Sequence, residues 1–153
     1  MTASRRNFVP GGSFFFTVNL AERRLSLLTD HLDVLRAAFR ETHQRHPFTI
    51  DAIVVLPDHL HAVWTLPEGD ADFAVRWRLI KSAFSRRVAR GERISSSRTA
   101  RGEHGIWQRR YWEHTIRDEG DFARHVEMFI AIRSSMGSST ACAIGGRPHS
   151  IVT

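Results

Sequence analysis

The sequence has a single cysteine, Cys142, and this scarcity limits the chemistry open to the protein. One cysteine cannot form an intrachain disulfide or build a thiolate metal cluster. No apolar run approaches the roughly 20 residues that span a bilayer, and residues 1–6 lack the apolar segment of a signal peptide. We therefore expect a cytoplasmic protein with no membrane partner, and a metal site in it would use histidine and oxygen ligands.

Lysine is equally scarce, because Lys81 is the only lysine among 22 basic residues, which face 16 acidic ones. An arginine-rich chain with a net charge of +6 favours a polyanionic partner, since the planar guanidinium group binds phosphate through two parallel hydrogen bonds. A GC-rich genome also raises arginine content, so charge alone leaves nucleic-acid binding open. The candidate phosphate contacts are Arg5, Arg6, Arg23, Arg24, Arg78, Lys81, Arg86, Arg87, Arg109 and Arg110.

Hydrophobic patterning predicts one α+β domain in these 153 residues. We expect strands over 13–20, 48–56, 59–66 and 106–117, and helices over about 27–46, 70–88 and 118–132. The stretch from about 89 to 105 has no periodicity and is predicted to be a mobile loop. The order βαββαβ followed by a helix is that of a ferredoxin-like split βαβ sheet with helices packed on one face.

Two histidines, His59 and His61, follow the turn at Pro57-Asp58. Side chains at i and i+2 of a strand point the same way, so this pair makes half of a metal site. A structural or solvent-facing pair is the alternative interpretation, because His-x-His also occurs by chance. Asp58 either accepts a hydrogen bond from an imidazole or stabilises the turn.

Several blocks of sequence resemble the REP-associated tyrosine transposases, a branch of the HUH-class (His, hydrophobic, His) single-strand transposases. The similarity covers about residues 5–127. Its blocks are GGSFFFTVNL at 11–20, VVLPDHLH at 54–61, WTLPEGD at 64–70, RWRLIK at 76–81 and IWQRRYWEHTIR at 106–117.

The resemblance implies cleavage and joining of single-stranded DNA beside small hairpins, with a tyrosine hydroxyl attacking a backbone phosphate. His59 and His61 correspond to the metal-binding histidines of that family, and the metal would be Mg²⁺ or Mn²⁺. Imidazole ligands suit Mn²⁺ better, because Mg²⁺ prefers oxygen. The implied partner is single-stranded or hairpin DNA.

The resemblance ends abruptly after Glu127. The family continues with a run of the form Tyr-Ile-His-x-Asn-Pro-Val-Lys-His-Gly-Leu-Val, in which the tyrosine is the nucleophile and the amide completes the metal shell. Here the tyrosine position is Met128, and the amide position is Ile132, which cannot bind a hard cation. The resemblance therefore predicts a chain without an intact catalytic residue.

We hypothesise that a one-base deletion in the tyrosine codon caused this break. In the shifted frame, each new codon joins the third base of one present codon to the first two bases of the next. The junction of Met128 and Phe129 must then encode Val, and that of Met136 and Gly137 must encode Gly. The junctions between them permit the Asn, Pro, Val, Lys and His of the family run. Restoring one T after the Glu127 codon makes the next codon Tyr. We therefore expect residues 1–132 to form the transposase-like domain and residues 133–153 to be a disordered tail read out of frame.

The only tyrosine, Tyr111, is expected to pack in the fourth strand, and His114 and His125 are expected to be surface or packing residues. Two functions remain open. The first is a transposase-family protein that binds single-stranded or hairpin DNA but has lost strand transfer. The second is a non-catalytic module that binds DNA or RNA, although the strands lack the aromatic signature of RNA-recognition motifs.

Overall fold

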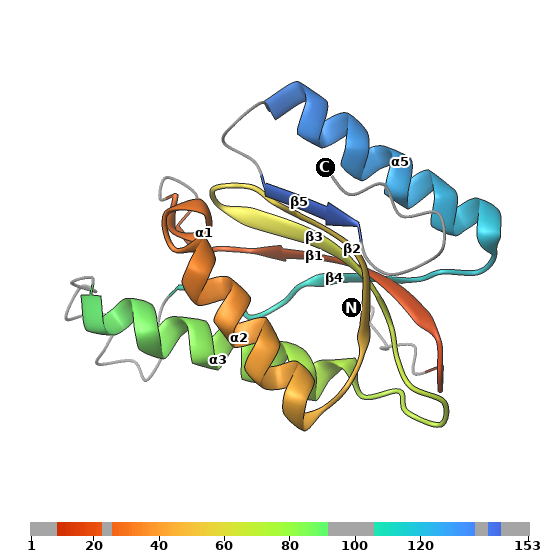
Figure 1. Ribbon diagram of the computed structural model, residues 1–153, viewed down its shortest axis with the longest axis horizontal. Helices are drawn as coiled ribbons and strands as arrows, with labels where there is room; N and C mark the ends of the chain where they lie inside the picture. Colours follow the sequence, from red (N-terminus) through yellow and green to blue (C-terminus); the bar gives the residue numbers. More distant parts are fainter. Residues whose placement is uncertain (1–8, 23–25, 92–105, 137–140, 145–153) are drawn as a thin grey trace, which may run out of the picture.

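The computed structural model describes residues 9–22, 26–91, 106–136 and 141–144. Within these ranges the chain forms one antiparallel sheet and helices on its two faces (Figure 1). The elements are β1 (Ser13–Asn19), α1 (Leu27–Asp30), α2 (Leu32–Arg45), β2 (Thr49–Val55), β3 (His59–Thr65), α3 (Phe73–Gly91), β4 (Trp112–Thr115), α5 (Glu119–Met136) and β5 (Ala141–Ile144).

The strands lie in the order β4-β1-β3-β2-β5, and every neighbouring pair is antiparallel. Four of these strands form the ferredoxin-like βαββαβ arrangement, so the predicted fold class is confirmed. The register aligns His61 with Thr17 of β1 and with Val54 of β2. These three side chains therefore share one face of the sheet, because residues paired across strands point the same way.

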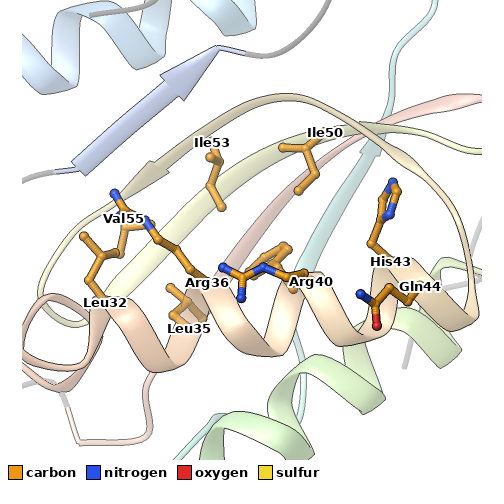
Figure 2. Close-up of a pocket in the computed structure, with 10 residues that line it drawn as sticks. Leu32, Leu35, Arg36, Arg40, His43, Gln44, Ile50, Ile53 and Val55 are labelled. Carbon is orange, nitrogen blue, oxygen red and sulfur yellow. The ribbon is translucent and has the colours of Figure 1, made fainter.

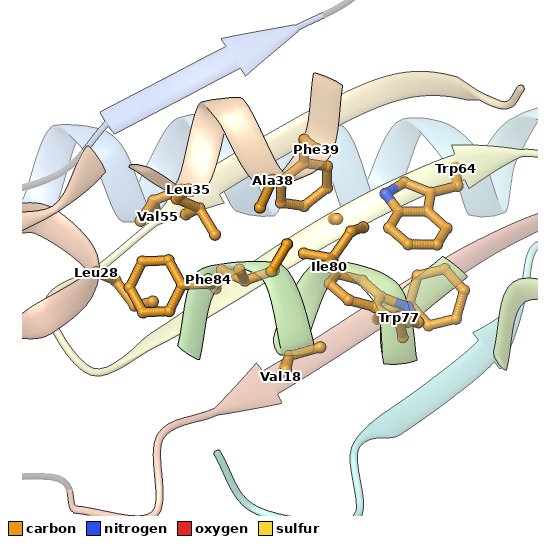
Figure 3. Packing of buried hydrophobic residues seen from close by; sticks show 14 of the residues in the cluster. Val18, Leu28, Leu35, Ala38, Phe39, Val55, Trp64, Trp77, Ile80 and Phe84 are labelled. Atoms are coloured by element: carbon orange, nitrogen blue, oxygen red, sulfur yellow. The ribbon is translucent and has the colours of Figure 1, made fainter. Parts of the chain in front are cut away.

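The opposite face packs against α2 and α3 and holds the larger core (Figure 3). Its centre is aromatic, with the indole rings of Trp64 and Trp77 stacked at a centroid distance of 4.2 Å. Phe16 contacts both rings, at 4.9 Å and 5.4 Å. Such aromatic pairs contribute about 0.5–1.5 kcal/mol each beyond their buried area, so this face fixes how the two helices sit on the sheet.

The third long helix, α5, covers the other face, which differs from the expected single helical layer (Figure 1). The reason lies in the strands, which carry apolar side chains on both sides. Phe15, Val54 and Val63 point away from α2 and α3 and are buried with Phe129 of α5. A sheet that is apolar on both faces needs cover on both.

Two predicted boundaries also change. Helix α3 continues through Gly91, so the start of the loop expected from residue 89 is helical, and residues 92–105 lie outside the described part of the chain. The expected disordered tail contains the end of α5 and the strand β5, which pairs with β2 from Ala52 to Val55. Strand pairing uses backbone groups and needs no side-chain pattern.

Arg76 lies on α3 near the exposed Arg78, but its own side chain is buried, with 1% of its surface exposed. Its guanidinium group donates to both carboxylate oxygens of Asp70 at 3.1 and 2.8 Å. It also donates to the backbone carbonyls of His46, Pro47 and Asp72. The charge is satisfied in the interior, and it joins the start of α3 to the turn between α2 and β2.

Candidate functional site

His59 and His61 lie at the start of β3, on the sheet face that α5 covers, with their ring centroids 5.1 Å apart. Nδ1 of His59 is 2.7 Å from Oδ1 of Asp58, and Nδ1 of His61 is 2.8 Å from Oγ1 of Thr17. A carboxylate can only accept, so Nδ1 of His59 carries a proton and the neutral ring has its lone pair on Nε2. Both rings are held through Nδ1, which is the arrangement of histidines that ligate metals through Nε2.

The surroundings of His61 keep it uncharged. Burial lowers the pKa of His61 to about 4, and the neighbouring His59 contributes to the same shift. The ring is therefore neutral at physiological pH, which is the state that a metal ligand requires.

Helix α5 closes this face with apolar side chains. The ring of Phe129, which is fully buried, lies 6.1 Å from the ring of His61, and Phe15 stacks on His61 at 5.7 Å. Met128 and Ile132 are partly buried against the same cluster. The two positions at which the sequence departs from the family run thus lie on the helix that faces the histidine pair, and neither supplies an oxygen or nitrogen ligand.

A second group of polar side chains lies beside the pair, between β4 and α5. Buried Asp121 is 2.9 Å from Nε2 of His114 and 3.4 Å from Nδ1 of His125. One ligand atom from each of these three residues lies within 4.8 Å of the others, so the cluster has the composition and size to hold a metal ion. The backbone N–H of Arg117 and the ring of His114 hold the pKa of Asp121 well below its usual range.

Several donor and acceptor atoms of this cluster are already engaged in hydrogen bonds that hold the start of α5. Nδ1 of His125 lies 2.8 Å from the backbone carbonyl of Asp121, and Oδ1 of Asp118 accepts from the Asp121 backbone N–H at 2.7 Å. The Asp121 carboxylate in turn accepts from the backbone N–H of Arg117 at 3.0 Å. The Asp118 side chain thus caps the start of α5, and the Asp121 carboxylate joins that start to the segment after β4.

The predicted phosphate contacts separate into groups in the structure. Arg78, Arg86 and Arg87 are exposed on α3, on the far side of the sheet from the histidines. Lys81 donates to the backbone carbonyl of Gln108 and lies 5.0 Å over the ring of Tyr111. Arg109 and Arg110 are exposed just before β4, and Arg5, Arg6, Arg23 and Arg24 lie outside the described residues.

Two arginines that the sequence did not single out lie closer to the histidine face. Arg117, two residues after β4, and Arg124, on α5, have side chains 71% and 64% exposed. Thr17 was missed as well, because its contact with His61 depends on the pairing of β1 with β3, 44 residues apart in the sequence. Periodicity within each segment carries no signal for such a pairing.

Two other features lie on the opposite face and so do not contribute to this site. Tyr111 packs 6.0 Å from Trp77 and 6.1 Å from Phe16, in the core under α3. A groove of about 450 Å³ between α2 and β2 is lined by apolar side chains and by Arg36, Arg40 and His43 (Figure 2). Within the described part of the chain, no helix is long and apolar enough to cross a membrane.

Comparison with known proteins agrees with this geometry. Residues 15–136 match the family model "Transposase IS200 like". The chain therefore belongs to the IS200-like transposases. It is 46% identical over 127 residues to a REP-associated tyrosine transposase of Escherichia coli K12, covering 83% of this chain and 69% of the relative. A putative REP-associated tyrosine transposase of Haemophilus influenzae is 42% identical over 128 residues, covering 83% of this chain and 73% of that protein. Within the family, the chain falls on this REP-associated branch.

Solved structures of transposases are also similar to this chain. A REP-associated tyrosine transposase bound to a REP hairpin matches with a TM-score of 0.74 and 43% identity, over 90% of this chain and 75% of that one. A putative transposase from Deinococcus radiodurans matches with a TM-score of 0.54 over 86% of this chain and 98% of that one. At 15% identity, the second match bears on the fold alone.

Proposed function

We propose that this protein binds hairpin DNA with an adjoining single strand, and that it retains the histidine half of a transposase active site without the nucleophile. The observation that carries the proposal is the His59–His61 pair, held through both Nδ1 atoms on the face below α5. The similar transposase bound to a REP hairpin, at 43% identity, supports DNA as the partner over RNA.

The residues present fit part of a divalent metal site. His59 and His61 would contribute Nε2 atoms, while Asp58 and Thr17 keep the rings oriented. A divalent cation there would supply polarisation of a DNA phosphate, which is the usual role of Mn²⁺ or Mg²⁺ in phosphoryl transfer. Ile132 adds no ligand, so two imidazoles would hold the cation weakly, and Mn²⁺ suits them better than Mg²⁺.

Strand cleavage through a phosphotyrosine needs an oxygen nucleophile on α5, and Met128 has none. A thioether sulfur has no proton to lose and cannot form the phosphoester intermediate. The remaining tyrosine, Tyr111, packs on the far face of the sheet against Trp77. We therefore propose that this chain binds DNA without cleaving it.

We also propose that the loss arose from a one-base deletion after the Glu127 codon. The shifted reading permits most of the family run over many consecutive codons, which few unrelated sequences would do. Resequencing the gene tests this directly. A downstream nucleotide sequence that does not encode the Tyr and Asn-Pro run in the shifted frame refutes the deletion.

The decisive experiment compares this protein with a variant in which the shifted frame is restored from position 128 onward. Each is incubated with Mn²⁺ and a labelled DNA hairpin that has a single-stranded tail, and covalent protein–DNA adducts are separated by denaturing electrophoresis. We expect both proteins to bind and only the restored variant to form an adduct. An adduct with the present chain would overturn the non-catalytic proposal, and failure of the present chain to bind the hairpin would overturn DNA binding.

A further inference from the structure

The most exposed large apolar side chain in the described part of the protein is Trp112, with 65% of its surface accessible. Two other tryptophans, Trp64 and Trp77, are fully buried, and Trp107 is partly buried. A buried indole removes about 150–250 Å² of surface from water. Trp112 leaves most of this apolar surface in water, so its side chain contributes little to the stability of the fold.

The position of Trp112 in the sheet connects it to the histidine pair. Trp112 pairs with Thr17 across β4 and β1, and Thr17 pairs with His61 across β1 and β3. The three side chains form one row on one face, because paired residues in adjacent strands point the same way. Two strand spacings of about 4.8 Å separate the backbones of Trp112 and His61, or roughly 10 Å in all.

Exposed arginines flank Trp112 along the chain. Arg109 and Arg110 precede it and are exposed, and Arg117, two residues after β4, has a side chain 71% exposed. An isolated indole among arginines is a poor surface for an apolar protein partner, which needs a contiguous patch. It has the composition of a single-strand nucleic-acid surface, where bases stack on aromatic rings and cations follow the phosphates.

We propose that Trp112 is the stacking platform for a base of the single-stranded DNA that leads to the histidine pair. This inference rests on the DNA-binding function proposed above, and it names the part of the DNA that is held. A base stacked on the indole orients the strand across β4 and β1, with its neighbouring phosphates directed toward His59 and His61. Because every base has a π-face, this contact is tolerant of sequence. Trp112 is thus a positioning residue for the single strand, distinct from whatever reads the hairpin.

The test measures binding to two DNA probes, a hairpin with a single-stranded tail and the same hairpin with a blunt end. The variants are Trp112→Leu, which removes the aromatic ring, and Trp112→Phe, which keeps one. Ile130→Ala, at an apolar position on α5 that is 39% exposed, is the matched control. Circular dichroism checks that each variant is folded.

Stacking contributes about 1–3 kcal/mol per base, so we expect Trp112→Leu to weaken binding of the tailed hairpin by about 5- to 150-fold. Binding of the blunt hairpin should be unchanged, and Trp112→Phe and Ile130→Ala should retain most of the affinity for both. The tailed probe should also quench tryptophan emission in the unmodified protein, and Trp112→Phe should abolish that quenching. Moving an abasic site along the tail should reveal one position at which Trp112→Leu has no further effect.

Three results would overturn the inference. Equal affinity of Trp112→Leu and the unmodified protein for the tailed hairpin would show that the indole does not touch the DNA. An equal loss for tailed and blunt probes would show that it does not serve the single strand. If the unmodified protein binds neither probe, the DNA-binding function itself fails, and this inference fails with it.

Discussion

Oγ1 of Thr17 on β1 lies 2.8 Å from Nδ1 of His61 on β3, so one hydroxyl sets the orientation of a candidate metal ligand on the neighbouring strand. In the metal-binding tautomer, Nδ1–H of His61 donates to this hydroxyl, and Nε2 is left for the cation.

Removing this hydroxyl tests whether it orients His61. Thr17→Val keeps the size and branching of the side chain but removes the hydrogen bond to the ring. Loss of such a partner lowers metal affinity by about 10- to 100-fold, which titration calorimetry with Mn²⁺ measures. Thr17→Ser keeps the hydroxyl and should restore most of the affinity. Equal Mn²⁺ affinity in the valine variant and the unmodified protein would contradict this role.

Substitutions can show which of the two histidine groups binds metal, the pair on β3 or the group around Asp121. If Mn²⁺ binds at the pair on β3, His59→Ala and His61→Ala should each abolish measurable binding. His114→Ala and His125→Ala should leave Mn²⁺ binding intact. One nitrogen of each ring is already hydrogen-bonded, Nε2 of His114 to the Asp121 carboxylate and Nδ1 of His125 to the Asp121 backbone carbonyl. Electron paramagnetic resonance of bound Mn²⁺ measures this directly. The reverse pattern would assign the metal to the cluster around Asp121.

The positions of the arginines predict which of them bind the DNA strand. The double variant Arg117→Gln, Arg124→Gln removes charge beside the histidine face. It should weaken binding of the tailed hairpin. It should also reduce the steepness of a plot of log affinity against log salt concentration, by about 0.7–0.9 for each phosphate that the variant no longer neutralises. The matched control, Arg78→Gln with Arg86→Gln, removes the same charge from α3 on the other face. Equal reductions in affinity for the two pairs would indicate that DNA wraps both faces.

Buried Arg76 should matter for stability and not for DNA. Arg76→Met leaves Asp70 and three backbone carbonyls without their donor. The Asp70 side chain is 36% exposed and can be hydrated, so we expect a cost of about 1.5–3 kcal/mol, the range for hydrogen bonds to a charged group. Urea denaturation should show a lower midpoint by a corresponding amount. Arg78→Met, two residues away and exposed, should change the free energy of unfolding by less than about 0.5 kcal/mol. A similar small effect from Arg76→Met would refute the structural role.

Asp121 should make stability depend on pH in the acid range. Its pKa is lowered in the folded protein, so its charge stabilises the fold above the ordinary carboxyl value of about 3.9. That contribution is lost as pH falls through the lowered value in the folded state. Asp121→Asn should therefore lower Tm at pH 7, and the difference should shrink below about pH 4. Asp33→Asn, exposed on α2, is the control, and a pH-independent difference for Asp121→Asn would contradict the argument.

The sequence alone predicted the main strands and helices, because Phe14 to Phe16 and the positions around Trp77 follow clear strand and helix periods. It also predicted His59 and His61 as a pair, since their spacing along one strand is enough to align them. It did not predict the register between neighbouring strands, so Thr17 and Trp112 were not recognised as sharing a row with His61. The burial of Arg76 was not predicted either, because its carbonyl partners come from the turn at His46 and Pro47, about 30 residues earlier.

Strand β5 has a consequence for how the chain behaves among its own copies. It pairs with Ala52 to Val55 along the outer edge of β2. An uncovered edge of this kind recruits strands from other molecules and promotes aggregation. β5 then forms the new edge of the sheet, and at four residues it is shorter than the seven-residue β2. Short edge strands are poor templates for pairing between molecules, so β5 should limit association between copies of this chain.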